Sequence, residues 1–298
     1  MGIRPTTMSE FIGQSQIRPV IQNAIDQAKA GKRLVPPTLL FGGPGLGKSA
    51  LASVIAHDTD TRLMMYTGGK DWTGVRVRKE LLNLDVRGYG PGGVWQPGAT
   101  KYTCFFDEVH AMNPNSYEAF FWPLESLEVH DGDTFWLPDI QFVFATTDPS
   151  LPKPFLDRIP LQLHLEPYAH DDLCKIVTRI HPHMAKGIVA EVARRSCGVA
   201  RLAINYSTAI DEYPGGLEWF DIMGIDSSGL TEGHRKYISV LEGAEGRPLS
   251  LPTLSSIMRE NVPTIRLLEE ELLRQGRINI TVHGRSLVTA SRGAKIRR

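Results

Sequence analysis

Cysteine is scarce in this chain, and its few copies are not spaced to bind a metal or to form a disulfide framework. The 298 residues include three cysteines, Cys104, Cys174 and Cys197, and none of them belongs to a C-x-x-C pair. Zinc modules use closely spaced pairs of cysteines, and disulfide-stapled folds use several cysteines at short spacings. We therefore expect three small apolar residues in a reducing compartment, with no zinc site and no disulfide scaffold.

The chain also lacks a net charge. Lysine plus arginine and aspartate plus glutamate both number 33, so no overall positive field would draw the molecule onto phosphate backbones. Contact with nucleic acid would have to be local. The best candidate is the basic C-terminal stretch, which carries Arg285, Arg292, Lys295, Arg297 and Arg298. For the last four residues, a solvated tail is an equally good interpretation.

Long apolar runs are missing as well. The composition, with 42% hydrophobic and 22% charged residues, is that of a globular protein rather than a disordered one. No run approaches the length of a membrane span, and the first residues have no apolar core of the signal-peptide kind. The sequence therefore predicts no membrane partner and a cytoplasmic location.

Short apolar runs that alternate with helical patterns predict an α/β fold. Residues 38–41, 102–106 and 140–145 are apolar runs of strand length that end in glycine or polar residues. Residues 17–30 have apolar side chains at helical spacing and are followed by Gly31, a typical helix terminator. Alternation of this kind favours a parallel sheet whose functional edge lies at the carboxyl ends of the strands.

Beyond Pro167 the pattern becomes helical. Helices are predicted at residues 171–181, 187–196 and 202–213, and a polar linker at residues 226–229. Three further helices, at residues 231–241, 253–260 and 264–274, precede two short strands at residues 278–280 and 286–289. Three helices followed by a hairpin are typical of a winged helix, which commonly binds DNA. The predicted domains are a nucleotide-binding sheet domain (1–166), a small helical lid (167–226) and a winged helix (227–298).

A glycine-rich loop is the clearest motif of the chain. Its residues fit G-x-x-x-x-G-K-[ST] in full, between a predicted strand and a predicted helix: Gly42, Gly43, Pro44, Gly45, Leu46, Gly47, Lys48 and Ser49. The glycines let backbone N–H groups point at a phosphate, the lysine adds charge at the γ-phosphate, and the serine is a ligand for Mg²⁺. The loop predicts binding of ATP with Mg²⁺, and a chance glycine turn is the alternative.

Two adjacent carboxylates follow the second apolar run. Asp107 would help to hold Mg²⁺, largely through water, and Glu108 would orient and activate the attacking water. This pair argues for hydrolysis of ATP rather than binding alone. An acidic pair after a strand can equally be a solvated loop, but the phosphate loop upstream disfavours that interpretation.

Three further residues are candidates for contacts with the γ-phosphate. Thr147 follows the third apolar run, and its hydroxyl is placed to bind the γ-phosphate or the water. Arg158 is a candidate arginine finger for the nucleotide of a neighbouring subunit, although its local pattern is also that of a surface arginine. Arg201 stands at the start of a lid helix, from which it would reach the γ-phosphate.

These residues together resemble the RuvB-type Holliday-junction branch-migration ATPases of the AAA+ class, over nearly the whole chain. The shared segments are Arg4-Pro5, Phe11-Ile12-Gly13-Gln14, Gly45-Leu46-Gly47-Lys48, Asp107-Glu108-Val109-His110, Trp122-Pro123-Leu124-Glu125 and Ala145-Thr146-Thr147, with Tyr168, Arg201 and Gly284-Arg285 further on. The combination is specific, because the clamp loaders and initiators that share the ATPase motifs usually lack a winged helix directly after the lid. The resemblance implies an AAA+ P-loop sheet domain, a helical lid and a C-terminal winged helix.

The resemblance also implies an activity and a set of roles. The chain would form a hexameric ring that hydrolyses ATP to move duplex DNA through a four-way junction. Arg4, Pro5, Phe11, Ile12 and Tyr168 would enclose the adenine. Thr147 would act as the first sensor, Arg201 as the second and Arg158 as the finger in trans. Arg285 would be the wing-tip residue that meets the DNA backbone.

Three features depart from the family pattern. The hairpin that grips a RuvA partner in the family corresponds here to a short stretch, residues 128–137, that turns at Asp131 and Gly132. The sequence therefore leaves open whether a RuvA-like loader binds this chain. Residues 87–100 are a glycine-rich insertion, either a partner or DNA loop or an ordinary surface loop. Leu156 stands where the family has a second arginine near the finger.

Two other functions remain open at this point. A clamp-loader subunit shares the acidic and threonine motifs, but it would carry a zinc module and a helical collar where this chain has neither cysteine pairs nor a collar. An ATP-gated winged-helix regulator would use ATP only as a switch, against which Glu108 and Arg158 argue.

Overall fold

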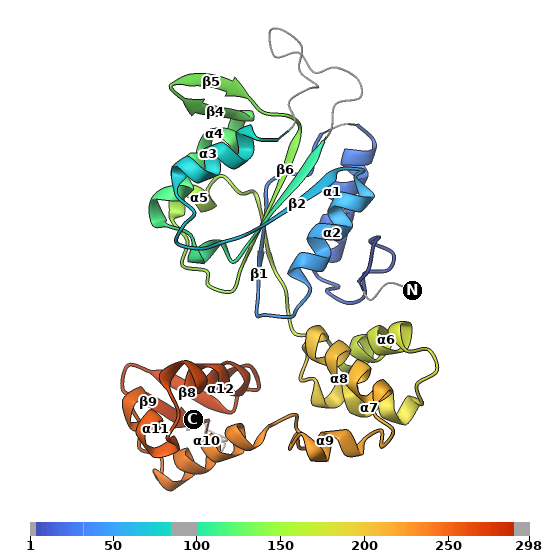
Figure 1. Ribbon diagram of the computed structural model, residues 1–298, viewed down its shortest axis with the longest axis vertical. Helices are drawn as coiled ribbons and strands as arrows, with labels where there is room; N and C mark the ends of the chain where they lie inside the picture. The colour runs from blue at the N-terminus through green and yellow to red at the C-terminus, as the bar shows by residue number, and fades with distance from the viewer. Residues whose placement is uncertain (1–3, 32, 85–100, 289–298) are drawn as a thin grey trace, which may run out of the picture. The chain divides into compact units, whose positions relative to one another are not determined.

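The computed structural model describes residues 4–31, 33–84 and 101–288. The chain divides into two compact units, one made of Met1–His183 with Gly198–Asn205 and the other of Met184–Cys197 with Tyr206–Arg298. The sequence predicted three domains, with boundaries after residues 166 and 226. That division remains a prediction. Figure 1 shows the elements of both units.

A five-stranded parallel sheet is the centre of the first unit. Its strands lie in the order β2, β3, β6, β1, β7, and every neighbouring pair is parallel. Their bounds are Thr38–Phe41 (β1), Arg62–Thr67 (β2), Tyr102–Asp107 (β3), Ile140–Thr146 (β6) and Leu161–His164 (β7). The predicted parallel α/β sheet is confirmed, and the carboxyl ends of β1, β3 and β6 meet at one edge.

The strands that the sequence revealed are the buried ones. Nearly every residue of β1, β3 and β6 is buried, which is why these strands read as continuous apolar runs. The edge strands β2 and β7 alternate between half-buried and exposed residues, and their short mixed patterns were not predicted. Edge position therefore explains which strands were missed.

Helices cover both faces of this sheet (Figure 1). Helices α1 (Arg18–Lys29) and α2 (Lys48–Asp58) lie on one face. The other face carries α3 (Gly74–Leu82), α4 (Phe121–Ser126) and α5 (Lys153–Leu156), with the short 3-10 helices η1 (Val109–Ala111) and η2 (Pro114–Phe120). The predicted helix at residues 17–30 corresponds to α1.

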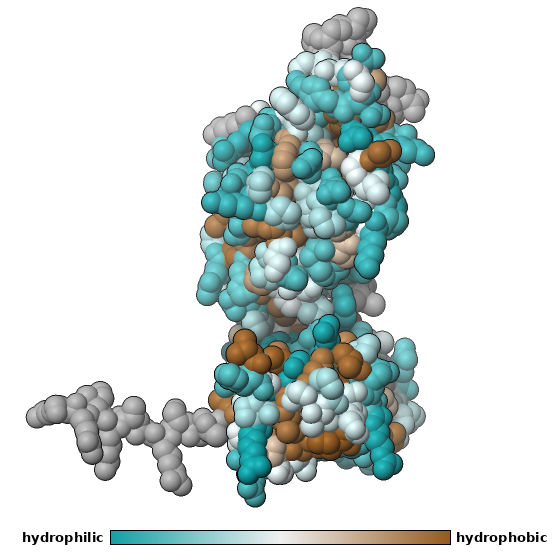
Figure 2. Space-filling model, turned by 90° about the vertical axis from the view of Figure 1, so that its left-hand side faces the viewer, coloured by the Kyte–Doolittle hydropathy of each residue, from teal (hydrophilic) through white to brown (hydrophobic). Residues whose placement is uncertain are grey.

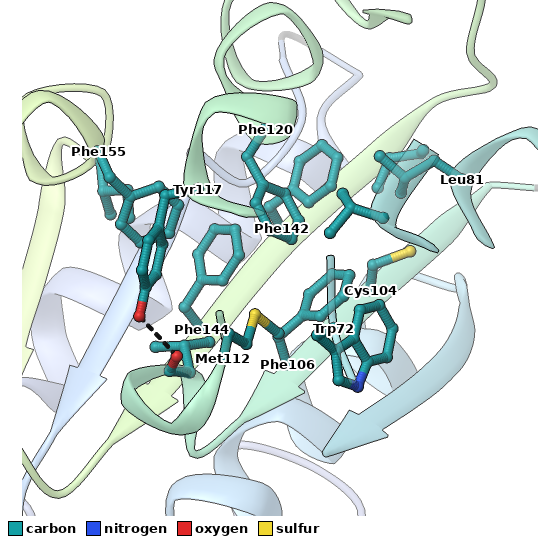
Figure 3. Packing of buried hydrophobic residues seen from close by; sticks show 14 of the residues in the cluster. Trp72, Leu81, Cys104, Phe106, Met112, Tyr117, Phe120, Phe142, Phe144 and Phe155 are labelled. Atoms are coloured by element: carbon teal, nitrogen blue, oxygen red, sulfur yellow. Dashed lines mark hydrogen bonds between the residues drawn. The ribbon is translucent and has the colours of Figure 1, made fainter. Parts of the chain in front are cut away.

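Aromatic side chains fill the second face, as Figure 3 shows. The Phe106 ring of β3 lies 5.5 Å from Trp72, 5.0 Å from Phe120 and 5.6 Å from Phe144, measured between centroids. Ring pairs at these distances, in edge-to-face or stacked arrangements, stabilise the fold beyond the effect of the apolar area that they bury. This packing fixes the end of β3, where the acidic pair begins.

The predicted hairpin of residues 128–137 is present. Strands β4 (Glu128–Asp131) and β5 (Asp133–Trp136) pair antiparallel around Gly132, whose backbone is left-handed, at φ +80°. The side chains of Phe135 and Trp136 are exposed. The glycine-rich stretch at residues 87–100, however, lies outside the described residues.

Between β7 and the last two strands, the elements that the structure describes are all helices. Their bounds are His170–Ile180 (α6), Lys186–Arg195 (α7), Ala200–Glu212 (α8), Glu218–Ile222 (α9), Glu232–Gly243 (α10), Leu251–Met258 (α11) and Val262–Arg274 (α12). The six helices predicted in this part agree with α6, α7, α8, α10, α11 and α12 to within a few residues. The short helix α9, which has only five residues, was not predicted.

The last three helices and a hairpin form the predicted winged helix. Leu230, Tyr237, Leu254, Ile265 and Leu272 lie in its apolar core. The hairpin pairs β8 (Ile278–Thr281) with β9 (Gly284–Leu287). Within the described residues, no helix combines the length and the apolar character that crossing a membrane requires.

Candidate functional site

The phosphate loop runs from the end of β1 to the start of α2, where the sequence placed it. Gly45 and Gly47 have left-handed backbones, with φ of +77° and +99°. A Cβ on Gly47 would lie 2.8 Å from the Tyr168 hydroxyl oxygen, and one on Gly45 would lie 2.7 Å from Val199 Cγ1. Both positions therefore require glycine, for conformation and for space.

Lys48 is held inside the loop that precedes it. Its Nζ donates to the carbonyl oxygen of Gly42 over 2.7 Å and to that of Gly43 over 3.0 Å. Burial lowers the pKa of Lys48, and the carboxylates of Glu108 and Asp107 counteract this effect. The ammonium thus lies close to both members of the acidic pair, in a place suited to an anionic ligand.

Asp107 ends β3 beside the first turn of α2. Its Oδ1 accepts a hydrogen bond from the backbone N–H of Glu108 over 3.0 Å, and its Oδ2 accepts one from Ser49 Oγ over 3.4 Å. A hydroxyl and a carboxylate side by side are the oxygen donors that Mg²⁺ prefers. Ser49 and Asp107 therefore fit the predicted metal site.

Glu108 has an unusual backbone for its residue type. Its φ is +48°, in the left-handed region that non-glycine residues seldom adopt. Thr147 Oγ1, from the residue after β6, donates to Glu108 Oε2 over 3.1 Å. The structure thus joins Glu108 and Thr147, which are 39 residues apart in the sequence, at the same edge of the sheet.

A cavity of about 300 Å³ lies next to the phosphate loop. Thirteen predicted site residues line it, and these are Arg4, Pro5, Phe11, Ile12, Pro44, Gly45, Gly47, Lys48, Ser49, Asp107, Glu108, Tyr168 and Arg201. Burial raises the pKa of Tyr168 to about 12, so its hydroxyl is neutral at ordinary pH. The predicted adenine residues and phosphate residues therefore share one space.

Other residues of the cavity wall were not predicted. Ile176 and Arg179 come from α6, while Ala200, Ile204 and Asn205 come from α8. Within each helix these residues are spaced so that they lie on one helical face, and this spacing could be recognised in the sequence. Which face of each helix meets the cavity depends on tertiary packing, however, and the sequence does not state it.

Some predicted residues lie away from the cavity wall. Leu46 is buried in the protein, while Gly42 and Gly43 contribute carbonyl groups to Lys48. Thr147 reaches the site through Glu108 rather than directly.

Arg158 is engaged within its own subunit. Its Nε lies 2.7 Å from Glu125 Oε1, and its Nη1 donates to the carbonyl of Pro154 over 2.7 Å. The guanidinium also lies over the ring of Phe121, with 4.1 Å to the centroid. Arg158 is not among the residues of the cavity wall, so its predicted role in trans stays a prediction.

The structure corrects the position of Arg285. The sequence placed it at the wing tip, but residues 282 and 283 form the turn and Arg285 already belongs to β9. Its backbone forms a bridge to Leu249. Pairing on both sides of β9 draws Arg285 away from the tip. Arg292, the other predicted DNA contact, lies outside the described residues.

The Arg285 side chain has a partner inside the winged helix. Its Nε donates to Glu269 Oε1 over 2.8 Å, and Tyr237 Oη donates to the same oxygen over 2.9 Å. The side chain of Glu269 is only 5% exposed, so this ion pair joins β9 to α12 within the domain core. That Arg285 also contacts DNA remains a prediction.

The winged helix also presents apolar side chains at its surface, and hydrophobic residues are visible on the face of this unit in Figure 2. Its exposed large apolar residues include Ile257 on α11, Leu267 and Leu273 on α12, and Ile280 on β8. Leu267 stands on the helix that usually enters the DNA groove in winged helices.

The fold and the site define the AAA+ class of P-loop ATPases, here with a helical lid and a C-terminal winged helix. Residues 3–74 match the P-loop domain of the Holliday junction DNA helicase RuvB, and residues 227–294 match the RuvB C-terminal winged helix domain. The chain thus combines a P-loop segment and a winged helix that both match RuvB family models.

Solved structures extend the similarity to RuvB over nearly the whole chain. The Thermotoga maritima RuvB Holliday junction branch migration motor superposes with a TM-score of 0.79 at 25% identity, covering 96% of this chain and 95% of that chain. A single-substitution mutant of the same T. maritima protein gives a TM-score of 0.80 at 25% identity, with 96% of both chains covered. The similarity thus includes the lid and both matched domains.

Proposed function

We propose that this chain is an ATP-hydrolysing ring motor that drives branch migration of Holliday-junction DNA. The observation that carries the proposal is the grouping of Lys48, Asp107 and Glu108 at one edge of the sheet, with Thr147 bonded to Glu108. Binding alone would need the lysine and the phosphate loop. The carboxylate of Glu108 is the addition that hydrolysis requires.

The residues divide the work as follows. Lys48 and the N-terminus of α2 bind the phosphates, and Arg4, Pro5, Phe11, Ile12 and Tyr168 enclose the base. Glu108 accepts a proton from the attacking water, while Thr147 fixes the Glu108 carboxylate. Arg201 contacts the γ-phosphate from the lid helix. Mg²⁺, held by Ser49 and by Asp107 largely through water, neutralises charge on the phosphates when it is bound.

Oligomerisation completes the site in this proposal. Arg158 would act on the nucleotide of the next subunit, so a homo-oligomer, expected to be a hexameric ring, is the active form. Its DNA substrate is double-stranded or four-way-junction DNA, bound in part through the winged helix. A RuvA-like loader would use the β4–β5 hairpin, whose exposed Phe135 and Trp136 are suited to a protein contact.

The assignment of Glu108 predicts a specific loss. Glu108→Gln keeps the shape of the side chain and leaves Lys48 and Asp107 in place, so ATP affinity should stay within about twofold of wild type. Hydrolysis should fall by about 100-fold or more, because the general base is lost. Fluorescent-nucleotide titration and phosphate release measure the two quantities. Lys48→Ala is the matched control that should lose ATP binding itself.

Turnover by Glu108→Gln at the wild-type rate would remove Glu108 from the mechanism. The DNA dependence of wild-type turnover separates the proposed motor from the other two functions. A branch-migration motor is stimulated by junction or duplex DNA and converts a labelled four-way junction to products. A clamp loader would require a clamp for stimulation, and an ATP-gated regulator would bind DNA with almost no turnover.

A further inference from the structure

One histidine at the site has no role in the proposed chemistry, yet it contacts the general base. His110 lies on η1, two residues beyond Glu108, and its Nδ1 is 3.2 Å from Glu108 Oε2. The same nitrogen is 3.0 Å from Thr146 Oγ1. His110 therefore links the turn after β3 to the end of β6.

The hydrogen bonds around Thr146 decide which atom of His110 carries the proton. The Thr146 hydroxyl donates its only hydrogen to the carbonyl of Asp148 over 2.7 Å and accepts from the Asp148 N–H over 3.1 Å. Its remaining contact, with His110 Nδ1, must therefore be an acceptor contact. An ionised Glu108 carboxylate can only accept as well. Nδ1 is thus the protonated nitrogen: its N–H donates to Thr146 Oγ1, and Glu108 Oε2 lies 3.2 Å from the same nitrogen as a close polar contact.

The backbone holds His110 and Glu108 in this arrangement. The Gly68 N–H donates to the Asp107 carbonyl over 2.7 Å, and the Ala111 N–H donates to the Glu108 carbonyl over 2.9 Å. Tyr117 Oη donates to the Val109 carbonyl over 2.8 Å, the bond drawn as a dashed line in Figure 3. The left-handed turn at Glu108 is therefore fixed from both sides, and His110 returns beside the Glu108 side chain.

We propose that His110 is a positioning residue for Glu108: together with Thr147 it anchors Oε2, so that Oε1 is left as the oxygen that accepts the proton of the attacking water. Thr147 Oγ1 donates a hydrogen bond to Oε2, and the N–H-bearing Nδ1 of His110 lies 3.2 Å from the same oxygen and attracts it electrostatically. Within the described part of the chain, no hydrogen bond to Oε1 competes with a water. The inference rests on the proposed function, because it assigns a role within the same hydrolytic site.

The test compares two amides that mimic different ring nitrogens. The Asn side-chain N–H₂ occupies the place of Nδ1, whereas the longer Gln side chain extends toward the place of Nε2. We expect His110→Ala and His110→Gln to lower kcat for ATP about tenfold with KM unchanged, and His110→Asn to restore most of the rate. A role in stability alone would not separate Asn from Gln in this way.

His130 supplies a matched control in the same chain. Its Nε2 is 3.4 Å from the carboxylate of Glu128, two residues away, and its Nδ1 is 3.1 Å from the hydroxyl of Thr134. It therefore has the same kinds of partners on the β4–β5 hairpin, apart from the cavity wall. His130→Ala should leave kcat and KM for ATP unchanged.

Unchanged kcat in His110→Ala, an equal loss in the Asn and Gln variants, or a change confined to KM would overturn the positioning role. A second readout does not depend on turnover. ¹⁵N NMR of the histidine rings in the full chain should show the His110 Nδ1 protonated, with a signal that shifts in Glu108→Gln. If the wild type fails to hydrolyse ATP, the proposed function fails, while an unprotonated Nδ1 or an unshifted signal overturns the His110 contact by itself.

Discussion

At the scale of single residues, the site depends on side chains that are placed by unusual backbone. Glycine supplies the left-handed conformation at positions 45 and 47, and Glu108 adopts it without being glycine. Strain of this kind persists only where the surrounding structure fixes it, which is common at functional sites. The phosphate loop and the turn at Glu108 thus hold the geometry of the site at a cost in local stability.

Gly47 gives a residue-scale prediction. Gly47→Ala should lower ATP affinity at least about tenfold, because the methyl group strains a φ of +99° and meets the Tyr168 hydroxyl at 2.8 Å. Gly31→Ala is the control: Gly31 also has positive φ, +68°, but nothing lies within 4 Å of its Cβ position. Both variants should lose about 1–2 kcal/mol of stability in thermal melts. Equal ATP affinity in the two variants would show that space at Gly47 does not matter.

At the scale of elements, the winged helix is held together by a buried ion pair as well as by its apolar core. Glu269 on α12 and Arg285 on β9 lie 2.8 Å apart, and Tyr237 on α10 binds the same carboxylate. Three elements therefore share one polar contact in the domain interior. Because the carboxylate is buried, removing its cation leaves a charge with too few partners.

Arg285→Ala should destabilise the winged helix by about 3–5 kcal/mol, because Glu269 is left without its cation. The double variant Arg285→Met with Glu269→Gln removes both charges, keeps an amide oxygen as acceptor for the Tyr237 hydroxyl, and should recover most of that loss. Urea unfolding followed by circular dichroism measures both. A loss below about 1 kcal/mol in the single variant would contradict the structural role. DNA affinity of the folded double variant then tests the predicted DNA contact without the complication of unfolding.

At the scale of the whole molecule, the proposed ring divides each catalytic site between two subunits. The subunit that binds the nucleotide would provide Lys48 and Glu108, and Arg158 would come from the neighbour. Within its own subunit Arg158 is held by Glu125 and Phe121.

Mixing two inactive variants tests this division. Arg158→Ala and Glu108→Gln should each lose about 100-fold or more of the ATPase rate alone, whereas co-assembled mixtures should regain part of it. In mixed rings, an intact site of the Arg158→Ala subunit receives Arg158 from a Glu108→Gln neighbour. A mixture of Glu108→Gln with Lys48→Ala forms no intact site and should stay inactive. Absence of recovery in rings shown to contain both subunits would contradict the role in trans.

The sequence by itself determined the features that depend on neighbouring residues. The phosphate loop, the acidic pair, the buried strands β1, β3 and β6 and the longer helices follow from local spacing and composition. The predicted winged helix followed from the order of its elements. Each of these signals is carried by residues close together in the chain, so a pattern can reveal it.

Only the tertiary structure decided what distant segments bring together. The carboxyl ends of parallel strands meet at one edge, and this joins Thr147 to Glu108 and Thr146 to His110, although β3 and β6 are separated by η1, η2, α4 and the β4–β5 hairpin. It also moved Arg285 from the expected wing tip into a pair with Glu269, because strand pairing depends on Leu249 in another segment. Such contacts depend on register and packing, which spacing along one chain does not encode.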